Sequence, residues 1–379
     1  MYSRSIKLPD KQSIFLFGPR GTGKTTLVKQ RYPHAVYLDL LEAKIFNELV
    51  GNPDRLDGMI PVGYTGAVII DEVQRIPELL NEVHRLIENK HYQFVMTGSS
   101  ARKLRRTGTN LLAGRALTYD LFPLTASEQG GDFNFEKASQ YGLLPTSLTS
   151  LTPEKYLASY VRTYLENEVL QEGLTRNIGG FARFLETISF SQGSLINASE
   201  IAREAMVERK VVENYVNILE DLLIAQRLPV FSYKAKRKLV THNKFYFFDA
   251  GIYRTLRPTG SLHNPGEIGG VVWESLFWQN LVAINSNLEL GYKPYFWRTA
   301  LGVEVDFVMY GERGLLAFEI KMSGKVDSHD LKGLKMFKGE YPMAKCFLIY
   351  GGERERSRGD IRILPIKQAL LDLPKILRG

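Results

Sequence analysis

The sequence predicts an α/β protein in which two α/β parts are joined by a helical segment. Short apolar runs alternate with amphipathic helices in residues 1–125, a helical pattern follows, and strand-like runs return from about residue 245. We therefore expect a parallel-sheet domain over residues 1–130, a helical segment over residues 150–244 and a second α/β domain over residues 245–379.

Five apolar runs are expected to form the strands of the first sheet, and the helical stretches between them favour parallel neighbours. They are Ser13–Phe17, Ala35–Asp39, Ala67–Asp71, Gln93–Gly98 and Leu117–Leu121. The polar stretch at residues 128–150, with scattered glycine and serine, is interpreted as an exposed connection.

The first strand leads into the glycine-rich segment GPRGTGKT, and a helix can start directly after it. The glycines let backbone N–H groups converge on phosphate oxygens, Lys24 adds charge at the β- and γ-phosphates, and the Thr25 hydroxyl ligates Mg²⁺. The helix N-terminus adds a partial positive charge. This pattern predicts a site for ATP and Mg²⁺ formed by Gly18, Pro19, Arg20, Gly21, Thr22, Gly23, Lys24, Thr25 and Thr26.

Two carboxylates follow the third strand. Asp71 is suited to hold Mg²⁺, and Glu72 is suited to orient an attacking water. Ser99, after the fourth strand, is a candidate to contact the γ-phosphate or the water; a helix cap by Ser99 or Ser100 is an equally good interpretation. Arg115, just before the fifth strand, is a candidate finger on the ATP of a neighbouring subunit, and an ordinary surface ion pair is the alternative.

Four segments carry a resemblance to a known family: GPRGTGKT, AVIIDEVQRIP, MTGSSARKL and LLAGRALTYDLFPLT. Their order resembles that of the prokaryotic AAA+ ATPases that have a C-terminal DUF4143 domain, and the resemblance covers most of the chain. It implies a P-loop AAA+ core, a winged-helix-like middle segment and a C-terminal restriction-endonuclease-like domain. It also implies homo-oligomers with ATP sites at subunit interfaces.

The middle segment predicts two helices and then a basic turn. The helices are expected from Asn197 and over Val207–Ile224, and apolar runs bracket the turn. This order is typical of a winged helix that binds DNA, and a helical bundle with a solvated loop is the alternative. The candidate DNA-binding residues are Lys234, Lys236, Arg237 and Lys238.

The C-terminal part is expected to be a second α/β unit. Its predicted strands are Phe245–Asp249, Tyr295–Arg298, Glu304–Tyr310, Leu315–Lys321 and Cys346–Tyr350, with helices over Trp273–Asn285 and near residues 328–338.

An acidic pattern in this part is similar to that of PD-(D/E)xK nucleases, although Val305 rather than proline precedes Asp306. Alternation along a strand places Glu319 and Lys321 on one face, with Ile320 in the core. Asp306 and Glu319 are candidates to share Mg²⁺, Lys321 to position the attacking water, and Glu274 to complete the acidic cluster. The alternative is that Lys321 forms a structural ion pair, and nuclease folds are also reused for binding alone.

Composition narrows the classes of function. The 379 residues carry a net charge of +8, which favours a polyanion such as nucleic acid, although a solvated lysine-rich surface explains it equally well. The single cysteine, Cys346, excludes a disulfide framework. No apolar run reaches the length of a membrane span, and the N-terminus has no signal-peptide core, so we expect a cytoplasmic protein without a membrane partner.

Two hypotheses of function follow. The first is an ATP-hydrolysing protein associated with DNA, whose C-terminal domain binds or cuts DNA with a divalent metal. The second is a nucleotide-controlled signalling or regulatory switch in which the nuclease-like domain is an inert recognition module. Salt-dependent DNA binding distinguishes them, because contacts to phosphates weaken steeply as salt rises.

Overall fold

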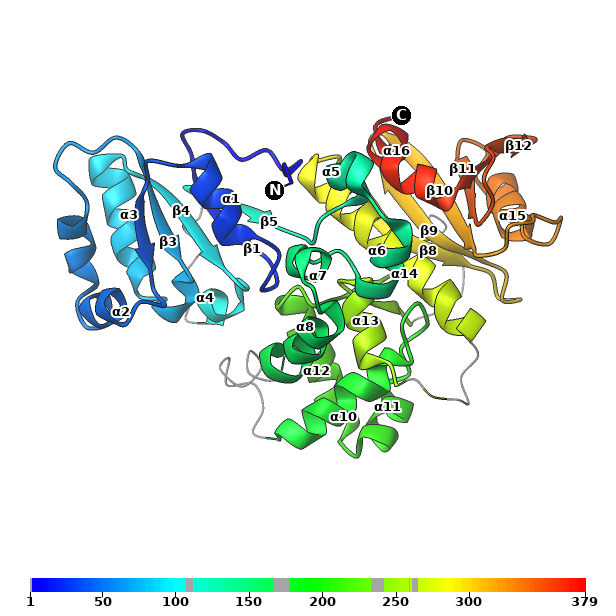
Figure 1. The fold of residues 1–379 in the computed structure, drawn as a ribbon, viewed down its shortest axis with the longest axis horizontal. Coiled ribbons are helices and arrows are strands. Elements are labelled where there is room, and N and C mark those ends of the chain that lie inside the picture. Colours follow the sequence, from blue (N-terminus) through cyan, green and yellow to red (C-terminus); the bar gives the residue numbers. More distant parts are fainter. Residues whose placement is uncertain are drawn as a thin grey trace. The chain divides into compact units, whose positions relative to one another are not determined.

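A computed structural model describes residues 2–106, 112, 114–165, 177–232, 242–258, 260 and 265–379. The chain is of mixed α/β class and divides into two compact units, shown in Figure 1. The N-terminal unit comprises Ile6–Phe122 with Asp221–Ile224, and the C-terminal unit comprises Met1–Ser5, Pro123–Glu220 and Ala225–Gly379.

The N-terminal unit contains a five-stranded parallel sheet in the order β2-β3-β4-β1-β5. Its strands are β1 Ser13–Phe17, β2 Val36–Asp39, β3 Ala67–Asp71, β4 Gln93–Gly98 and β5 Ala116–Asp120. All five predicted strands are confirmed, and β1, β3 and β4 have the predicted bounds. Both faces of β1 are buried: Phe15 and Phe17 pack in one core cluster, Ile14 and Leu16 in the other.

Helices pack on both faces of this sheet, and its central strands β1 and β3 are therefore buried along their whole length. The helical elements are α1 Lys24–Arg31, α2 Ala43–Val50, η1 Pro53–Met59, η2 Val73–Arg75, α3 Leu79–Lys90 and α4 Arg102–Arg106.

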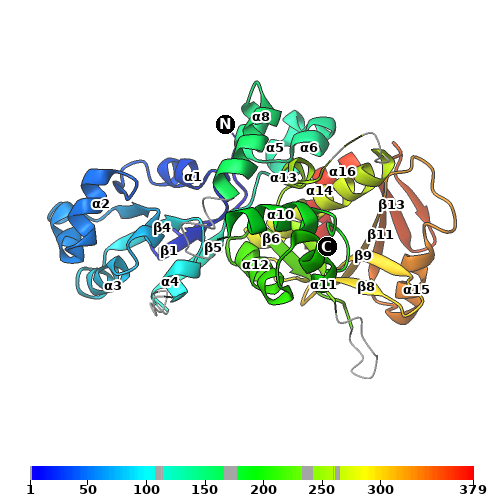
Figure 2. The same cartoon turned by 90° about the horizontal axis from the view of Figure 1, so that it is seen from below.

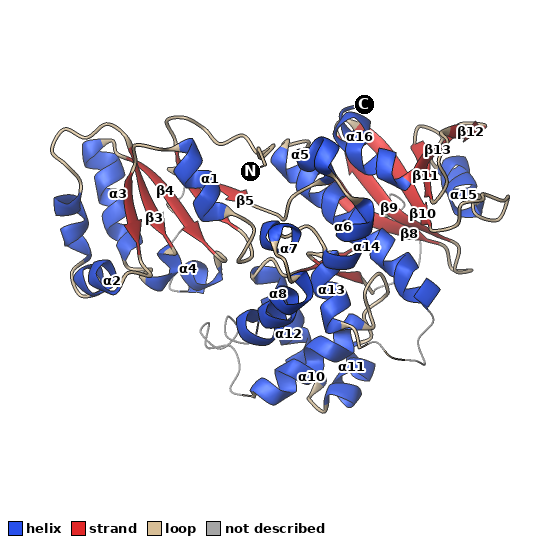
Figure 3. Ribbon diagram, viewed as in Figure 1, coloured by secondary structure: helices blue, strands red, loops and turns tan. Residues whose placement is uncertain are grey.

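The C-terminal unit contains a six-stranded mixed sheet in the order β12-β13-β11-β10-β9-β8, seen in Figures 2 and 3. Its strands are β8 Lys293–Arg298, β9 Glu304–Gly311, β10 Gly314–Lys321, β11 Lys345–Tyr350, β12 Arg356–Arg358 and β13 Ile361–Pro365. One face packs against α14 (Pro265–Asn287) and α16 (Ile366–Arg378), the other against α15 (Lys332–Glu340). The predicted strands and helices here are confirmed, whereas β12, β13 and α16 were not anticipated.

The rest of this unit is largely helical. It contains α5 Ala126–Gln129, η3 Gly130–Asp132, α6 Phe135–Tyr141, α7 Pro145–Thr149, α8 Pro153–Ser159, η4 Tyr160–Leu165, α10 Ile178–Ser189, α11 Ala198–Ala205, α12 Arg209–Asp221, β6 Ala225–Leu228, β7 Lys244–Phe247 and α13 Ala250–Leu256. The helices predicted from Asn197 and over Val207–Ile224 are confirmed by α11 and α12. Among the described residues, no helix is long and apolar enough to cross a membrane.

The interpretation of residues 128–150 as an exposed connection was wrong. This stretch forms short helices, and its apolar side chains, among them Phe135 and Ala138 of α6 and Leu143 after it, lie in the core of the C-terminal unit. Helices of one or two turns show too few residues for a 3.6-residue period to stand out from a polar background.

The candidate DNA-binding residues Lys234, Lys236, Arg237 and Lys238 lie outside the described residues. On either side of them, β6 and β7 pair antiparallel after α10, α11 and α12. The winged helix stays a prediction.

A buried carboxylate, Asp249, joins three parts of the C-terminal unit. Oδ1 accepts hydrogen bonds from the backbone N–H groups of Gly251 (2.9 Å) and Ile252 (3.2 Å), and so caps α13. Oδ2 accepts from the backbone N–H of Leu143 (2.7 Å) and from Nε2 of Gln279 on α14 (3.3 Å). Burial raises the pKa of Asp249, while these donors lower it.

We expect Asp249→Asn to destabilise the C-terminal unit by roughly 1–3 kcal/mol, because the amide replaces one acceptor oxygen with a donor that faces other N–H donors. Urea unfolding followed by circular dichroism measures the loss. Asp360→Asn, at an exposed carboxylate, is the matched control. Equal stability of the two variants would contradict the anchoring role of Asp249.

Candidate functional site

The loop between β1 and α1 has the backbone conformations that its glycines were predicted to supply. Gly21 and Gly23 have φ of 80° and 95°, which side chains other than glycine rarely adopt. A Cβ on Gly18 would lie 2.3 Å from the carbonyl oxygen of Leu121, so only glycine fits there. The loop therefore turns tightly at the carboxyl end of the parallel sheet, where ligands of such sheets bind.

Lys24 and Thr25, the first residues of α1, take the positions expected of phosphate-loop residues. The buried Lys24 ammonium donates to the carbonyl oxygens of Gly18 (2.7 Å) and Pro19 (3.2 Å), inside the loop. The Thr25 hydroxyl donates to Oδ2 of Asp71 (2.8 Å), at the end of β3. The structure thus brings together the two residues predicted to bind Mg²⁺.

Asp71 receives two further hydroxyl donors, from the strands on either side of β3. Tyr37 of β2 and Thr97 of β4 both donate to its carboxylate, which is 4% exposed. Burial, followed by the hydrogen bond to Asp71, raises the pKa of Tyr37, so its hydroxyl stays protonated. Sequence reasoning missed Tyr37, because a single tyrosine inside a strand belongs to no motif.

Glu72 lies in the left-handed region with φ of 60°, at the turn after β3. Its carboxylate accepts from Nε2 of Gln74, which also donates to the Ser99 hydroxyl (3.3 Å). Gln74 was not anticipated, and it connects two predicted site residues. The Ser100 hydroxyl accepts instead from the backbone N–H of Arg102 (3.3 Å), the first residue of α4.

Arg115 is not part of this arrangement within its own chain. It directly precedes β5, and Ala116 pairs with Ser13 at the start of β1, whereas Phe17 at the other end pairs with Asp120. The five residues of β5, about 16 Å of strand, separate it from the level of the phosphate loop. Its guanidinium pairs with the exposed Glu88 and lowers the pKa of that carboxyl.

A second polar cluster lies in the C-terminal unit. Alternation along β10 places Glu319 and Lys321 together, with Lys321 Nζ 2.7 Å from Glu319 Oε1, and Ile320 lies in the core as predicted. Oδ2 of Asp306, on β9, accepts from the backbone N–H of Ile320 (2.8 Å). Asp306, Glu319 and Lys321 are therefore close together, as predicted. The ion pair of Lys321 with Glu319, which was the alternative interpretation, is also present.

Lys244, a residue that sequence reasoning missed, joins this cluster. Its Nζ pairs with Glu304, lies 3.4 Å from Glu274 Oε1 and 3.8 Å from Asp306 Oδ1, and its side chain is 3% exposed. Burial lowers the pKa of Lys244, but Glu274, Asp306 and Glu304 together raise it above its ordinary value. The lysine therefore stays charged. No motif includes it, since it precedes Glu274 by 30 residues in the chain.

The carboxylates differ in how fully they are paired. Glu274 also accepts from the Tyr246 hydroxyl, and Glu304 lies 3.5 Å from Arg298. In contrast, Oε2 of Glu319 is buried and has no hydrogen-bond partner within the part of the chain that the structure describes. Burial, and then the neighbouring Asp306, raise the pKa of Glu319.

Part of this cluster fits a divalent cation. The unpartnered Glu319 oxygen and the adjacent Asp306 offer the hard oxygen ligands that Mg²⁺ prefers. Glu274 and Glu304 are engaged by Lys244, and over the described ranges no group of three or more His, Cys, Asp or Glu side chains is placed to hold a metal. The fit is therefore to Asp306 and Glu319 rather than to all four carboxylates.

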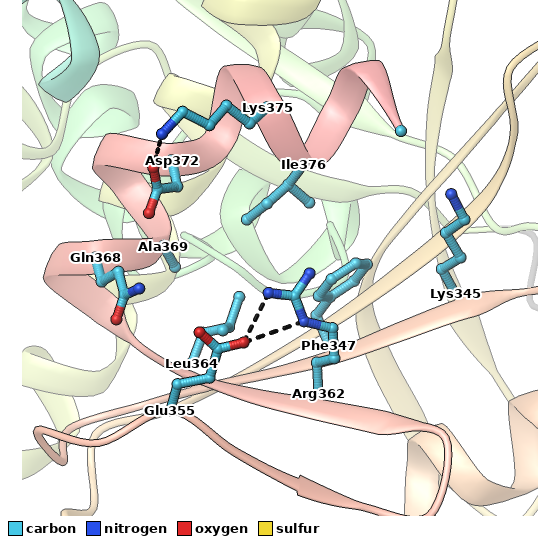
Figure 4. Close-up of a pocket in the computed structure, with 11 residues that line it drawn as sticks. Lys345, Phe347, Glu355, Arg362, Leu364, Gln368, Ala369, Asp372, Lys375 and Ile376 are labelled. Carbon is cyan, nitrogen blue, oxygen red and sulfur yellow. Dashed lines mark hydrogen bonds and ion pairs between the residues drawn. The ribbon is translucent and has the colours of Figure 1, made fainter.

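A separate cavity of about 280 Å³ lies between β11, β13 and α16 (Figure 4). Arg362 pairs there with Glu355 (2.7 Å) and Lys375 with Asp372 (2.9 Å), so these charges are balanced. Phe347 in its wall is paired with Phe318, the neighbour of Glu319 in β10, and thus faces the opposite side of the sheet. The cavity is distinct from the carboxylate cluster.

Comparison with known families agrees with the geometry of the phosphate loop. Residues 10–129 match the family model of an AAA domain. This part of the chain is an AAA-type domain. Residues 132–263 match a domain of unknown function, DUF8612, and residues 269–369 match another, DUF4143. The AAA and DUF4143 parts of the predicted resemblance are confirmed, whereas the nuclease-like nature of the last domain stays a prediction.

Several proteins are similar in sequence to most of this chain. Proteins of Mycobacterium bovis and Mycobacterium tuberculosis, both named only as uncharacterized, are each 27% identical over 370 residues, covering 94% of this chain and 80% of theirs. A protein of Haemophilus influenzae, also named as uncharacterized, is 23% identical over 310 residues, 77% of this chain and 74% of its own.

Two solved structures align at low similarity. The ORC1 protein of Aeropyrum pernix, in complex with DNA, aligns over 66% of this chain and 87% of that chain, with a TM-score of 0.26 and 14% identity. The DNA clamp loader delta protein of Bacillus subtilis aligns over 54% and 83%, with a TM-score of 0.22 and 13% identity.

We expect Tyr37→Phe to lower the free energy of unfolding of the N-terminal unit by about 1 kcal/mol, because one hydrogen bond to Asp71 is lost. In an Asp71→Asn background the same change is expected to cost less, and denaturant unfolding of the four proteins in this double-mutant cycle measures the coupling. An identical cost in both backgrounds would show that the Tyr37 hydroxyl does not act through Asp71.

Proposed function

We propose that this protein binds and hydrolyses ATP, associates with DNA, and uses its C-terminal unit to bind or cut DNA with a divalent cation. The observation that carries the ATPase part is the hydrogen bond between Thr25 and Asp71, beside Lys24 inside the phosphate loop. The match to an AAA domain supports the same function.

In the proposed hydrolysis each residue has a separate part. Lys24, which contacts loop carbonyls at 2.7 and 3.2 Å, exchanges them for oxygens of the β- and γ-phosphates. Thr25 and Asp71 would hold Mg²⁺, which would offset phosphate charge when bound. Glu72 orients the attacking water, and the bond from Gln74 fixes the direction of that carboxylate.

Arg115 fits a role between subunits better than one within its own subunit. It lies at the start of β5, whereas the phosphate loop follows the end of β1. We propose that it reaches the γ-phosphate held by a neighbouring copy in a homo-oligomer, after exchanging its ion pair with Glu88.

The C-terminal part of the proposal is supported by Asp306, Glu319 and Lys321. Asp306 and Glu319 would hold one Mg²⁺, which would lower the pKa of a bound water and offset phosphate charge. Lys321, 36% exposed and paired with Glu319, would orient that water. The net charge of +8 and the basic residues Lys234, Lys236, Arg237 and Lys238 favour DNA as the partner.

One observation favours the second candidate function, a nucleotide-controlled switch whose C-terminal unit recognises a partner without cutting it. Lys244 already balances charge among Glu274, Glu304 and Asp306, so much of the cluster is stable without a metal. Measured metal-dependent cleavage decides between the two.

For the ATPase, we expect Lys24→Ala to lose ATP binding and turnover. Glu72→Gln is expected to keep ATP binding but to lower turnover about 100-fold or more, because the base that orients the water is lost. Phosphate release and nucleotide binding are measured side by side, with the exposed Lys44→Ala as control. Normal ATP turnover in both Lys24→Ala and Glu72→Gln would contradict the proposed ATPase activity.

For the C-terminal unit, we expect Mg²⁺- or Mn²⁺-dependent cleavage of single-stranded, duplex or branched DNA, lost in Glu319→Ala and Lys321→Ala. The assay is run with and without ATP, and DNA binding is measured at rising salt. An absence of cutting on every DNA, with binding that does not change with salt, would instead support the switch.

A further inference from the structure

The side chain of Gln74 is buried at the carboxyl end of the parallel sheet. Gln74 lies on η2, directly after the turn at which Glu72 follows β3, and it is 7% exposed. Its neighbours Val73 and Ile76 are fully buried in the core of the N-terminal unit. The backbone that carries the Gln74 amide is therefore anchored on both sides.

The amide nitrogen of Gln74 has two hydrogens, and each has an acceptor. Nε2 donates to Oε2 of Glu72 and to the Ser99 hydroxyl (3.3 Å), which follows β4. A carboxylate only accepts hydrogen bonds, so the nitrogen and not the oxygen of the amide must face Glu72. One buried amide thus joins the residue proposed to orient the attacking water to the residue predicted to contact the γ-phosphate.

The amide oxygen of Gln74 fits closely against β4. Oε1 is buried and has no hydrogen-bond partner among the described residues, and a Cβ on Gly98 would lie 2.4 Å from it. Gly98, the last residue of β4, therefore leaves the space that the amide occupies. Because a buried acceptor without a donor costs free energy, the two bonds from Nε2 must keep the amide in this orientation.

The bond from Gln74 also directs the hydroxyl of Ser99. Since the Ser99 oxygen accepts from Nε2, its own hydrogen points to a different acceptor. Ser99 is 4% exposed, and it follows Gly98, which pairs with Phe17 just before the phosphate loop. A γ-phosphate oxygen is an acceptor that ATP supplies and ADP lacks.

We propose that Gln74 is a positioning residue for ATP hydrolysis: its amide holds Glu72 and Ser99 together, so that contact with the γ-phosphate sets the direction of the carboxylate that orients the water. This inference rests on the proposed ATPase activity and adds to it the link through Ser99. In the reaction the water oxygen bonds to the γ-phosphorus, the bond from that phosphorus to the bridging oxygen breaks with its electron pair left on ADP, and a water proton passes to Glu72. Gln74 itself exchanges no proton.

The first test is Gln74→Met, which keeps the length of the side chain and removes both donors. In the full-length protein, kcat for ATP is expected to fall about 10- to 100-fold, because the orientation of Glu72 is lost. The KM for ATP is expected to rise no more than about 5-fold, the equivalent of one hydrogen bond. Gln12→Met, at an exposed glutamine before β1, is the matched control and is expected to leave both constants unchanged.

Two backgrounds separate positioning from a general loss of structure. In E72Q, single-turnover rates are expected to fall less than about 2-fold further on adding Q74M, because the carboxylate that Gln74 directs is already gone. In S99A, adding Q74M is expected to leave the preference for ATP over ADP unchanged, whereas in the wild type it lowers that preference about 5-fold. Calorimetric titration with each nucleotide measures the preference.

Gly98→Ala tests the same amide without removing a donor. The added Cβ displaces Oε1, so kcat is expected to fall, and the double variant G98A/Q74M is expected to be no slower than Q74M. If Q74M is insoluble, G98A decides in its place. A wild-type kcat and ATP preference in Q74M, or an equal fall of turnover in the E72Q background, would overturn the inference.

Failure of the proposed ATPase activity has a different signature. A wild-type protein that binds ATP but does not hydrolyse it contradicts that activity, and the preference for ATP over ADP then still tests the link between Gln74 and Ser99. A wild-type protein that binds no ATP contradicts both.

Discussion

The pairing of the Lys244 ammonium is the interaction on which the C-terminal unit depends. A charge with 3% exposure is tolerated only where opposite charges surround it, and here they come from α14 and β9. The lysine itself lies on β7, next to the predominantly helical part of the unit. One ionic contact thus joins a two-stranded ribbon, a long helix and the six-stranded sheet. Asp249 joins elements in a similar way, but its partners are neutral. Groups from α13, from α14 and from the chain before α7 all donate hydrogen bonds to this one buried carboxylate.

The carboxylates of the two candidate sites have different kinds of partners. At the phosphate loop, Asp71 accepts from the hydroxyls of Thr25, Tyr37 and Thr97, groups that can turn from donating to a carboxylate to ligating a metal or bonding a phosphate. In the C-terminal cluster, lysine and arginine balance most of the carboxylate charge, while Glu319 keeps a buried oxygen that has no hydrogen-bond partner among the described residues. The hydroxyl donors at the phosphate loop suit reversible nucleotide binding. The ion pairs of the C-terminal cluster suit a single fixed position for a cation.

Much of the fold could be predicted where local pattern and tertiary environment agree. The strands β1, β3 and β4 were predicted to the residue, because central parallel strands are buried on both faces and stand out as short, mostly apolar runs. The stretch at residues 128–150 was misread, because its buried residues are spread over helices too short to show a period. The strands β12 and β13 were not predicted, because β12 is wholly exposed and neither strand carries a motif.

The sequence by itself determined the phosphate loop, the acids that follow β3, and the alternation that puts Glu319 and Lys321 on one face, since each depends on spacing along one or two neighbouring elements. Tertiary structure alone decided the partners of those groups. Tyr37 lies near Asp71 because β2 pairs with β3. Gln74 reaches Glu72 through the turn after β3. Lys244 contacts Glu274, which lies 30 residues further along the chain. Hydrogen bonds and ion pairs act over a few ångströms in space, and separation along the chain does not reveal which charges folding brings that close.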